Sequence, residues 1–159
     1  MSTSMEIRPA LPPDAGELLD LIRQHAAFER GTASLTLGSL AGILAAECPP
    51  TRIVVAVREG RLLGYAALTF DYALWRAERF GHLDCLFVSE AERGQGIGKA
   101  LFHHVLGMAD RAAAERLEWQ TPTWNGDAIR FYIREGGAGQ PKMRFSLAVP
   151  PRDQGAAPC

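Results

Sequence analysis

Three glycines lie close together at Gly94, Gly96 and Gly98, and their spacing is the most informative chemical feature of the sequence. Glycine lets the backbone adopt positive φ angles and approach a ligand closely. An apolar run precedes these glycines, and apolar residues at helical spacing follow them. The free N–H groups and the positive dipole end of a helix start favour phosphate. The segment 93–99 is therefore predicted to bind a phosphate group.

The spacing excludes the two most familiar phosphate-binding loops. A Walker A loop requires GxxxxGK followed by Ser or Thr, whereas Gly94 and Gly98 are one residue too close together and Ala100 follows Lys99. A dinucleotide-binding fingerprint requires GxGxxG after the first strand, whereas this GxGxG lies in mid-chain. A glycine-rich turn without any ligand is the remaining alternative. It is disfavoured because three glycines weaken a helix start unless a ligand needs the space.

Strands and helices are predicted to alternate around this loop. Runs of β-branched or apolar residues predict strands near 7–10, 52–58, 62–70, 80–88, 116–120 and 142–149. Apolar residues recurring at i+3 and i+4 predict helices near 14–28, 36–48, 96–114 and 126–135. A tight turn at 59–61 joins two of the strands into an antiparallel hairpin. This order indicates a mixed α/β sandwich with one central sheet.

Length and composition narrow the class of protein. The 159 residues fit one domain, and 47% hydrophobic with 22% charged residues is ordinary for a soluble globular chain. Seventeen basic and eighteen acidic residues give a net charge of -1, which argues against a nucleic-acid partner. No apolar run is long enough to span a membrane and residues 1–8 are polar, so a cytoplasmic protein without a membrane partner is expected.

The cysteines point away from a metal site. Cys48, Cys85 and Cys159 are odd in number and far apart, with no CxxC pair. Neither a disulfide framework nor a zinc site is expected from this spacing, and a reducing cytosol fits best. Cys85 is predicted to be buried and inert rather than a nucleophile, because the sequence suggests no His–acid partner for it.

Two motifs together resemble those of the GCN5-related N-acetyltransferases, the GNAT superfamily. The first is Arg-x-x-Gly-x-Gly at Arg93, Gly96 and Gly98, just after Leu86-Phe87-Val88. The second is the run 124–132, which resembles the family's Asn…Ala-x-x-Phe-Tyr helix. The likeness covers residues 7–147. It implies one acetyltransferase domain over 5–149. Residues 150–159 are rich in Pro, Gly and Ala and are predicted to form a disordered tail.

The resemblance also implies a fold and a subgroup. The fold is a central, mostly antiparallel sheet of about six or seven strands with a splayed parallel pair, flanked by about four helices. The segments 21–23, 28–29, 118–119 and 124–125, together with Phe70 and Trp75, resemble the diamine (spermidine/spermine-type) acetyltransferases. A homodimer is expected from the same likeness.

Acetyl-CoA is the cosubstrate that the resemblance implies. The backbone of residues 86–88 would pair with the pantetheine arm, the amides of 94–99 would hold the pyrophosphate, and Asn125 with its neighbours would line the other side. Tyr132 would lie near the sulfur and protonate the leaving thiolate. The predicted cofactor-binding residues are Leu86, Phe87, Val88, Arg93, Gly94, Gln95, Gly96, Ile97, Gly98, Lys99, Asn125, Asp127, Ala128 and Tyr132.

Transfer of an acetyl group to an amine requires a proton acceptor but no covalent nucleophile. An alkylammonium has a pKa of ~10.4, so about one molecule in 2,500 is neutral at pH 7, which costs ~4.6 kcal/mol. A carboxylate can bind the ammonium and accept its proton, directly or through water. We predict that Asp84 does so, because strand alternation separates it from Leu83 and Cys85. The alternative is a solvated or salt-bridged sheet residue.

Further residues are predicted to bind the acceptor amine. Glu29 would anchor its far end and Trp75 would contact its methylenes or its cation. Ordinary structural roles are the alternatives: a surface acid for Glu29, a core or interface aromatic for Trp75, and core packing for Tyr132. His25 and His82 are isolated and predicted to be structural. The predicted substrate-binding set is Phe28, Glu29, Trp75, Asp84, Glu118 and Trp119.

The sequence departs from the diamine-type pattern on the acceptor side. Cys85 and Ala73 stand where many of those sequences carry acids, so this pocket has less negative charge. A polyamine, a thialysine-like amino acid or a similar small primary amine is therefore the expected acceptor. The alternatives are a protein lysine or N-terminus, and a CoA-binding module without catalysis.

Overall fold

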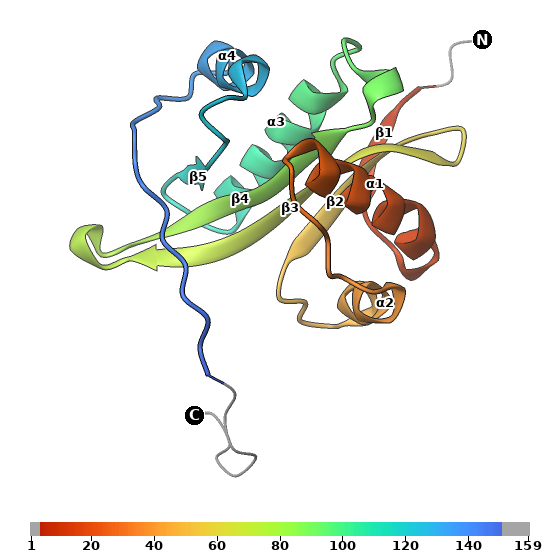
Figure 1. Ribbon diagram of the computed structural model, residues 1–159, viewed down its shortest axis with the longest axis horizontal. Helices are drawn as coiled ribbons and strands as arrows, with labels where there is room; N and C mark the ends of the chain where they lie inside the picture. The colour runs from red at the N-terminus through yellow and green to blue at the C-terminus, as the bar shows by residue number, and fades with distance from the viewer. Residues whose placement is uncertain (1–3, 151–159) are drawn as a thin grey trace. The chain divides into compact units, whose positions relative to one another are not determined.

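The computed structural model describes residues 4–150, in which strands and helices alternate as the sequence predicts (Figure 1). The chain divides into two compact units, Met1–Asn125 and Gly126–Cys159. The first unit contains β1 (Glu6–Pro9), α1 (Ala15–Phe28), α2 (Leu37–Ala45), β2 (Arg52–Arg58), β3 (Arg61–Ala73), β4 (Glu78–Val88), α3 (Ile97–Arg111) and β5 (Leu117–Trp119), with short 3-10 turns η1 (Pro12–Asp14), η2 (Leu74–Arg76) and η3 (Glu90–Glu92). The second unit contains α4 (Gly126–Arg134).

One five-stranded sheet forms the centre of the first unit. Its strands follow the order β1-β2-β3-β4-β5, with every pair antiparallel except β4 and β5, which are parallel. In Figure 1, α1 lies in front of the sheet and α3 behind it, and each packs against β3 and β4. The predicted mixed α/β fold with four helices is therefore confirmed. No helix between residues 4 and 150 is long and apolar enough to cross a membrane.

The sheet has five strands rather than the expected six or seven, because residues 138–150 form no regular structure. The prediction of a strand at 142–149 is wrong for these described residues, although its apolar side chains do alternate. A strand also needs a neighbour to satisfy its backbone N–H and C=O groups, and here none pairs with it. Its alternate apolar side chains are largely exposed: Met143, Phe145, Leu147 and Val149. The predicted disordered tail lies outside the described residues, except for Pro150.

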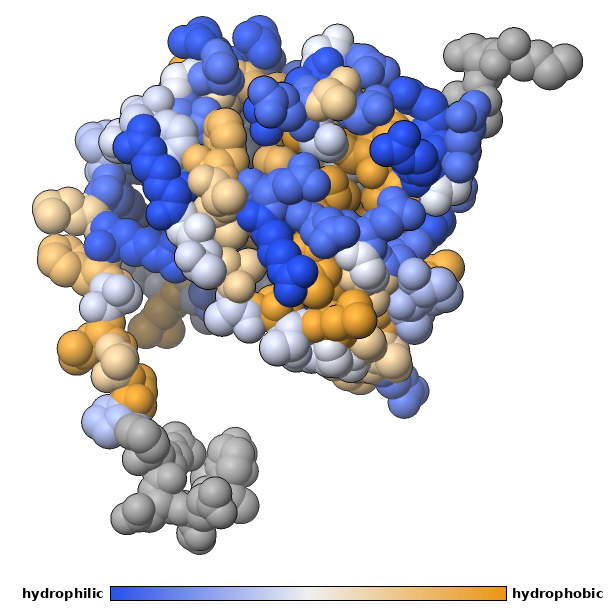
Figure 2. Space-filling view, turned by 45° about the vertical axis from the view of Figure 1, so that its right-hand side comes forward, coloured by the Kyte–Doolittle hydropathy of each residue, from blue (hydrophilic) through white to orange (hydrophobic). Residues whose placement is uncertain are grey.

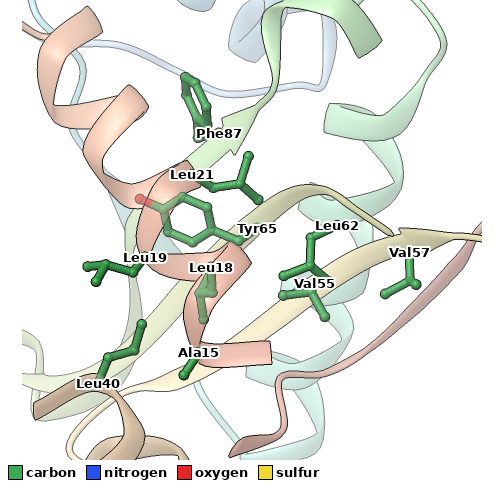
Figure 3. Close-up of a cluster of buried hydrophobic side chains, with 10 residues drawn as sticks. All are labelled: Ala15, Leu18, Leu19, Leu21, Leu40, Val55, Val57, Leu62, Tyr65 and Phe87. Atoms are coloured by element: carbon green, nitrogen blue, oxygen red, sulfur yellow. The ribbon is translucent and has the colours of Figure 1, made fainter. Parts of the chain in front are cut away.

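A hydrophobic cluster joins α1 to the sheet. Leu18 and Leu21 of α1 pack against Tyr65 of β3 and Phe87 of β4, and the Tyr65 residue is only 2% exposed. Figure 3 shows the Tyr65 ring among these side chains, with its hydroxyl oxygen beside α1. Fully burying one apolar side chain stabilises the folded state by ~1.5–3 kcal/mol.

Hydrophilic residues cover much of the surface seen in Figure 2.

A β-bulge interrupts the pairing of β3 with β4 at Asp84. Ala67 pairs with Cys85 and Leu68 pairs with Leu83, which leaves Asp84 as the extra residue. Simple alternation would place Gly81, Cys85 and Phe87 on one face. Instead, a Cβ at Gly81 would point at Ala109 of α3, whereas Cys85 and Phe87 pack on the α1 side. The bulge thus changes the face of β4, as an extra residue does.

Gly64 permits the close approach of β3 to the end of β4. A Cβ at this position would lie 2.5 Å from the carbonyl oxygen of Phe87 and 3.1 Å from the Cα of Val88. Real Cβ atoms essentially never come within 3.0 Å of a heavy atom outside their own residue and its two chain neighbours. The last residues of β4 therefore keep their position only while residue 64 has no side chain.

Gly64→Ala is expected to lower the free energy of unfolding by about 1–3 kcal/mol, the usual cost of overpacking a rigid interior. Gly42→Ala in α2 is the matched control, because nothing lies within 4 Å of its Cβ position. Because Ala is favoured over Gly in a helix interior, that change is expected to raise the free energy of unfolding by at most ~1 kcal/mol. Urea unfolding of both variants measures the difference. Equal stability of the two variants would contradict the close approach.

Candidate functional site

The glycine loop has the backbone geometry of an anion-binding turn. Gly94 and Gly96 have φ angles of 78° and 79°, and open space surrounds both Cβ positions. Helix α3 begins directly after them, with the Ala100 N–H donating to the Gly96 carbonyl at 3.0 Å. The N–H groups of a first helical turn have no acceptor within the helix, and this turn contains no acidic side chain. These residues fit a phosphate group.

The edge of β4 beside this loop is open to a further extended strand. β5 pairs only with residues 81–83 of β4, and within residues 4–150 no other strand pairs on that side. Residues 84–88 continue beyond this pairing toward the loop. The Arg93 Nε donates to the Val88 carbonyl at 3.1 Å and ties the loop to the strand end. An extended ligand with amide groups could add to this edge as a strand does.

Two carboxylates converge on one half-buried polar cluster. Asp84 is exposed on the bulge, and its Oδ2 accepts from the Cys85 thiol at 3.5 Å. Glu29 follows α1 directly, and its Oε1 lies 3.4 Å from the Nε2 of His25. The His25 Nδ1 lies 2.8 Å from the Tyr65 hydroxyl. The five side chains therefore connect α1, β3 and β4.

Burial and these two carboxylates set the protonation of the cluster. Burial, with the charges of Asp84 and Glu29 adding to it, raises the pKa of the Cys85 thiol to about 12. The same influences raise the pKa of Tyr65 far above its ordinary value. Both groups are neutral at pH 7. A thiol this weakly acidic is a poor nucleophile, which agrees with the inert role predicted for Cys85.

Aromatic and guanidinium groups border the same region. The Phe28 ring lies 5.8 Å from that of Trp124, and the Arg30 guanidinium lies 4.4 Å from the Trp124 ring centre. The Arg93 guanidinium lies 4.9 Å from the Phe28 ring and 5.5 Å from the Phe87 ring. Arg93 thus acts on the cluster directly, whereas Arg30 borders it through Trp124 and Phe28. The sequence predicted Phe28 and Arg93, but no role for Arg30.

The structure does not bring three of the predicted acceptor residues to this cluster. Trp75 is fully exposed in η2, at the tip of the β3–β4 hairpin. Glu118 on β5 accepts from the Arg116 Nε at 2.6 Å. Trp119 packs edge-on against Phe102 of α3, with ring centres 5.3 Å apart. Their roles in binding an acceptor gain no support from these positions.

The remaining predicted residues lie just before α4 and within it. Asn125 ends the first unit, and its N–H donates to the Pro122 carbonyl at 2.9 Å. In the second unit, Asp127 forms an ion pair with Arg130, and Ala128 lies in the same helix. The Tyr132 and Phe131 rings contact each other at 5.1 Å. The roles of these residues toward acetyl-CoA stay predictions.

A separate cavity of about 560 Å³ lies elsewhere in the first unit. Its lining includes Ile43 of α2, Ile53 of β2 and Met108 of α3, and none of the predicted site residues. It adjoins the C-terminal half of α3, whereas the glycine loop precedes the N-terminus of that helix. Its volume therefore provides no support for the site described above.

Comparison with known proteins identifies the family. Residues 17–136 match the model of the acetyltransferase (GNAT) family. The aminoalkylphosphonate N-acetyltransferase of Salmonella typhimurium is 31% identical over 144 residues, which cover 91% of each chain. The thialysine N-epsilon-acetyltransferase of Mus musculus is 26% identical over 141 residues, 81% of each.

Solved structures show the same fold at lower identity. An integron cassette protein from V. cholerae superimposes with a TM-score of 0.73, at 24% identity and over 92% of this chain and 94% of its own. An aminoglycoside acetyltransferase from an uncultured soil metagenomic sample, in complex with sisomicin, gives a TM-score of 0.75 at 18% identity, over 91% and 96%. The family match and the two N-acetyltransferase relatives show that the chain belongs to the acetyltransferase (GNAT) family and is an N-acetyltransferase.

Proposed function

We propose that this enzyme transfers the acetyl group of acetyl-CoA to the primary amine of a small molecule that also carries an acidic group. Acetyl-CoA is the cosubstrate of the family. The observation that carries the proposal is the convergence of Asp84 and Glu29 on one polar cluster, with Arg30 and Arg93 at its border. Two carboxylates with guanidinium groups at their border suit a zwitterion.

The glycine loop and the open edge of β4 would hold acetyl-CoA, which supplies the acetyl thioester. The positive φ angles of Gly94 and Gly96 leave room for phosphate oxygens at the start of α3. The backbone of Leu86 and Val88 would pair with the amides of the pantetheine arm. Asn125, Asp127 and Ala128 are proposed to line its other side.

Asp84 is proposed to bind the acceptor ammonium and to take its proton. Its exposed position on the bulge lets water or an amine reach the carboxylate directly. The nitrogen of the neutral amine then forms a bond to the acetyl carbon while the carbon–sulfur bond breaks. The nitrogen releases a second proton, and Tyr132 is proposed to return one proton to the sulfur. The overall reaction releases one proton to solvent.

The charges of the site favour an amino acid or aminophosphonate over a long polyamine. A polyamine carries several positive charges and no acid, so the guanidinium groups of Arg30 and Arg93 would repel it. Cys85 adds no negative charge, because its thiol is neutral. Two similar relatives are named for aminoalkylphosphonate and thialysine, both of which combine an amine with an acid. These names support the proposal.

Mass spectrometry of the products tests the reaction. The protein is mixed with acetyl-CoA and with 2-aminoethylphosphonate, thialysine, putrescine, spermidine, an aminoglycoside or a lysine peptide. One acetyl group is expected on the zwitterionic amines, at a higher kcat/KM than on the polyamines. Transfer to the peptide alone, or bound acetyl-CoA with no transfer to any acceptor, would overturn the proposal.

Asp84→Asn is expected to lower kcat/KM for the amine by about 10²-fold or more, the usual size of a general-base contribution. Asp71→Asn is the control, because Asp71 is an exposed acid on β3 outside the cluster. Its kcat/KM is expected to stay within about two-fold of wild type. Steady-state kinetics at saturating acetyl-CoA compares the two. Similar losses in both variants would count against Asp84 as the proton acceptor.

Arg30→Gln is expected to lower kcat/KM about five-fold for 2-aminoethylphosphonate but not for putrescine, since an exposed ion pair contributes up to ~1 kcal/mol. Arg61→Gln is the control, because Arg61 is an exposed arginine at the start of β3. The ratio of the two kcat/KM values is the measurement. An unchanged ratio in Arg30→Gln would exclude Arg30 as the partner of the acidic group.

A further inference from the structure

We propose that His25 is a positioning residue that orients Glu29 toward the acceptor and makes acceptor binding sensitive to acid. His25 lies in the last turn of α1, and its side chain is 15% exposed. The sequence offered no motif around it and predicted a structural role. The kinetic part of this inference rests on the proposed function, whereas its titration part does not.

The position of the imidazole is fixed from two sides. Its ring is stacked on Phe87, with centres 5.1 Å apart and planes inclined by 17°. It meets the Tyr65 ring edge-on at 5.9 Å. Since Phe87 and Tyr65 both belong to the buried cluster shown in Figure 3, the ring cannot turn without disturbing the core. Its two nitrogens therefore keep constant directions.

These directions determine the tautomer of the neutral ring. An ionised carboxylate only accepts hydrogen bonds, so the Nε2 facing Glu29 at 3.4 Å must carry the proton. The Nδ1 then accepts, and the Tyr65 hydroxyl donates to it at 2.8 Å. Tyr65 can do so at any ordinary pH because burial keeps its hydroxyl protonated. Tyr65 thus orients His25, and His25 orients Glu29.

Charged and titratable groups face His25 from every element around it. They are Glu29 at the end of α1, Tyr65 on β3, Asp84 and Cys85 on β4, and Arg93 in the glycine loop. Burial lowers the pKa of His25, the two carboxylates oppose this change, and Arg93 adds to it. The net effect is a pKa below the ordinary value, so the ring is neutral at pH 7.

Acid would therefore change the charge that an acceptor ammonium meets. Protonation places a cation beside Glu29 and within the electrostatic reach of Asp84, the group proposed to bind the ammonium. Repulsion then weakens acceptor binding. The hydrogen bond from Arg93 to the Val88 carbonyl ties the glycine loop to the end of β4 and does not involve His25, so binding of acetyl-CoA is expected to change little. The KM for the amine should rise only as the pH falls well below 6.5, because burial lowers the pKa of His25 beneath that ordinary value, while the KM for acetyl-CoA stays constant.

Two substitutions separate the orienting role from the titration. His25→Leu removes both hydrogen bonds and is expected to raise the KM for the amine about ten-fold at pH 7.5, with the KM for acetyl-CoA unchanged. His25→Gln keeps a donor and an acceptor but cannot titrate. It is expected to keep the KM for the amine near the wild-type value and to lose the rise in acid.

His82→Gln provides the matched control. His82 lies on the same strand as Asp84, and its Nδ1 lies 3.5 Å from the Thr69 hydroxyl rather than beside Glu29 or Tyr65 as in His25. This variant is expected to keep both the KM and its dependence on pH. An unchanged KM for the amine in His25→Leu, or a persistent rise in acid in His25→Gln, would overturn the proposal.

NMR titration of His25 gives a readout that needs no activity. The charge of Glu29 raises the pKa of His25, so Glu29→Gln is expected to lower that pKa further, and Asp71→Asn to leave it unchanged. An unchanged His25 pKa in Glu29→Gln would show that the two groups are not coupled. A normal shift with no acetyl transfer by the wild type would contradict only the proposed function.

Discussion

The pairing of β3 with β4 is the constraint on which the site depends. One extra residue, Asp84, enters β4 without a partner in β3, so its carboxylate points to solvent while Cys85 and Phe87 turn toward α1. The close approach at Gly64 then fixes the end of β4 beside the glycine loop. A regular strand would have placed Cys85 and Phe87 on the α3 side, far from His25. The bulge is therefore what brings an acid, a thiol and an aromatic ring to one end of the sheet.

The electrostatics of the cluster follow from its depth. Tyr65, Cys85 and His25 are deep enough that burial keeps each of them neutral at pH 7. Asp84 and Glu29 remain at the surface, where water stabilises their charges. Neutral donors and acceptors beneath two charged groups can orient those groups without cancelling their charge. Such an arrangement suits binding of a cation.

The local signals of the sequence predicted the helices, the first five strands and the glycine loop, because periodicity and glycine spacing reflect backbone requirements. The position of Asp84 was predicted for an incomplete reason, since alternation does not reveal the bulge. The roles proposed for His25 and Arg30 were not predicted, because they rest on contacts with residues distant in sequence: Tyr65, Asp84 and Trp124. The strand at 142–149 shows the reverse case, in which the side-chain pattern is present but no neighbouring strand pairs with the backbone.

The bulge at Asp84 also limits how the length of this chain can vary. Side chains of a strand alternate with a period of two. One residue inserted between Gly81 and Asp84 would therefore turn the side chains that precede it to the opposite face of the sheet. The tip of the β3–β4 hairpin is under no such restriction, because its residues 74–77 are exposed and hold no part of the cluster. Insertions and deletions among relatives of this protein should therefore occur mainly at the hairpin tip. The segment from Gly81 to Val88 should keep a constant length.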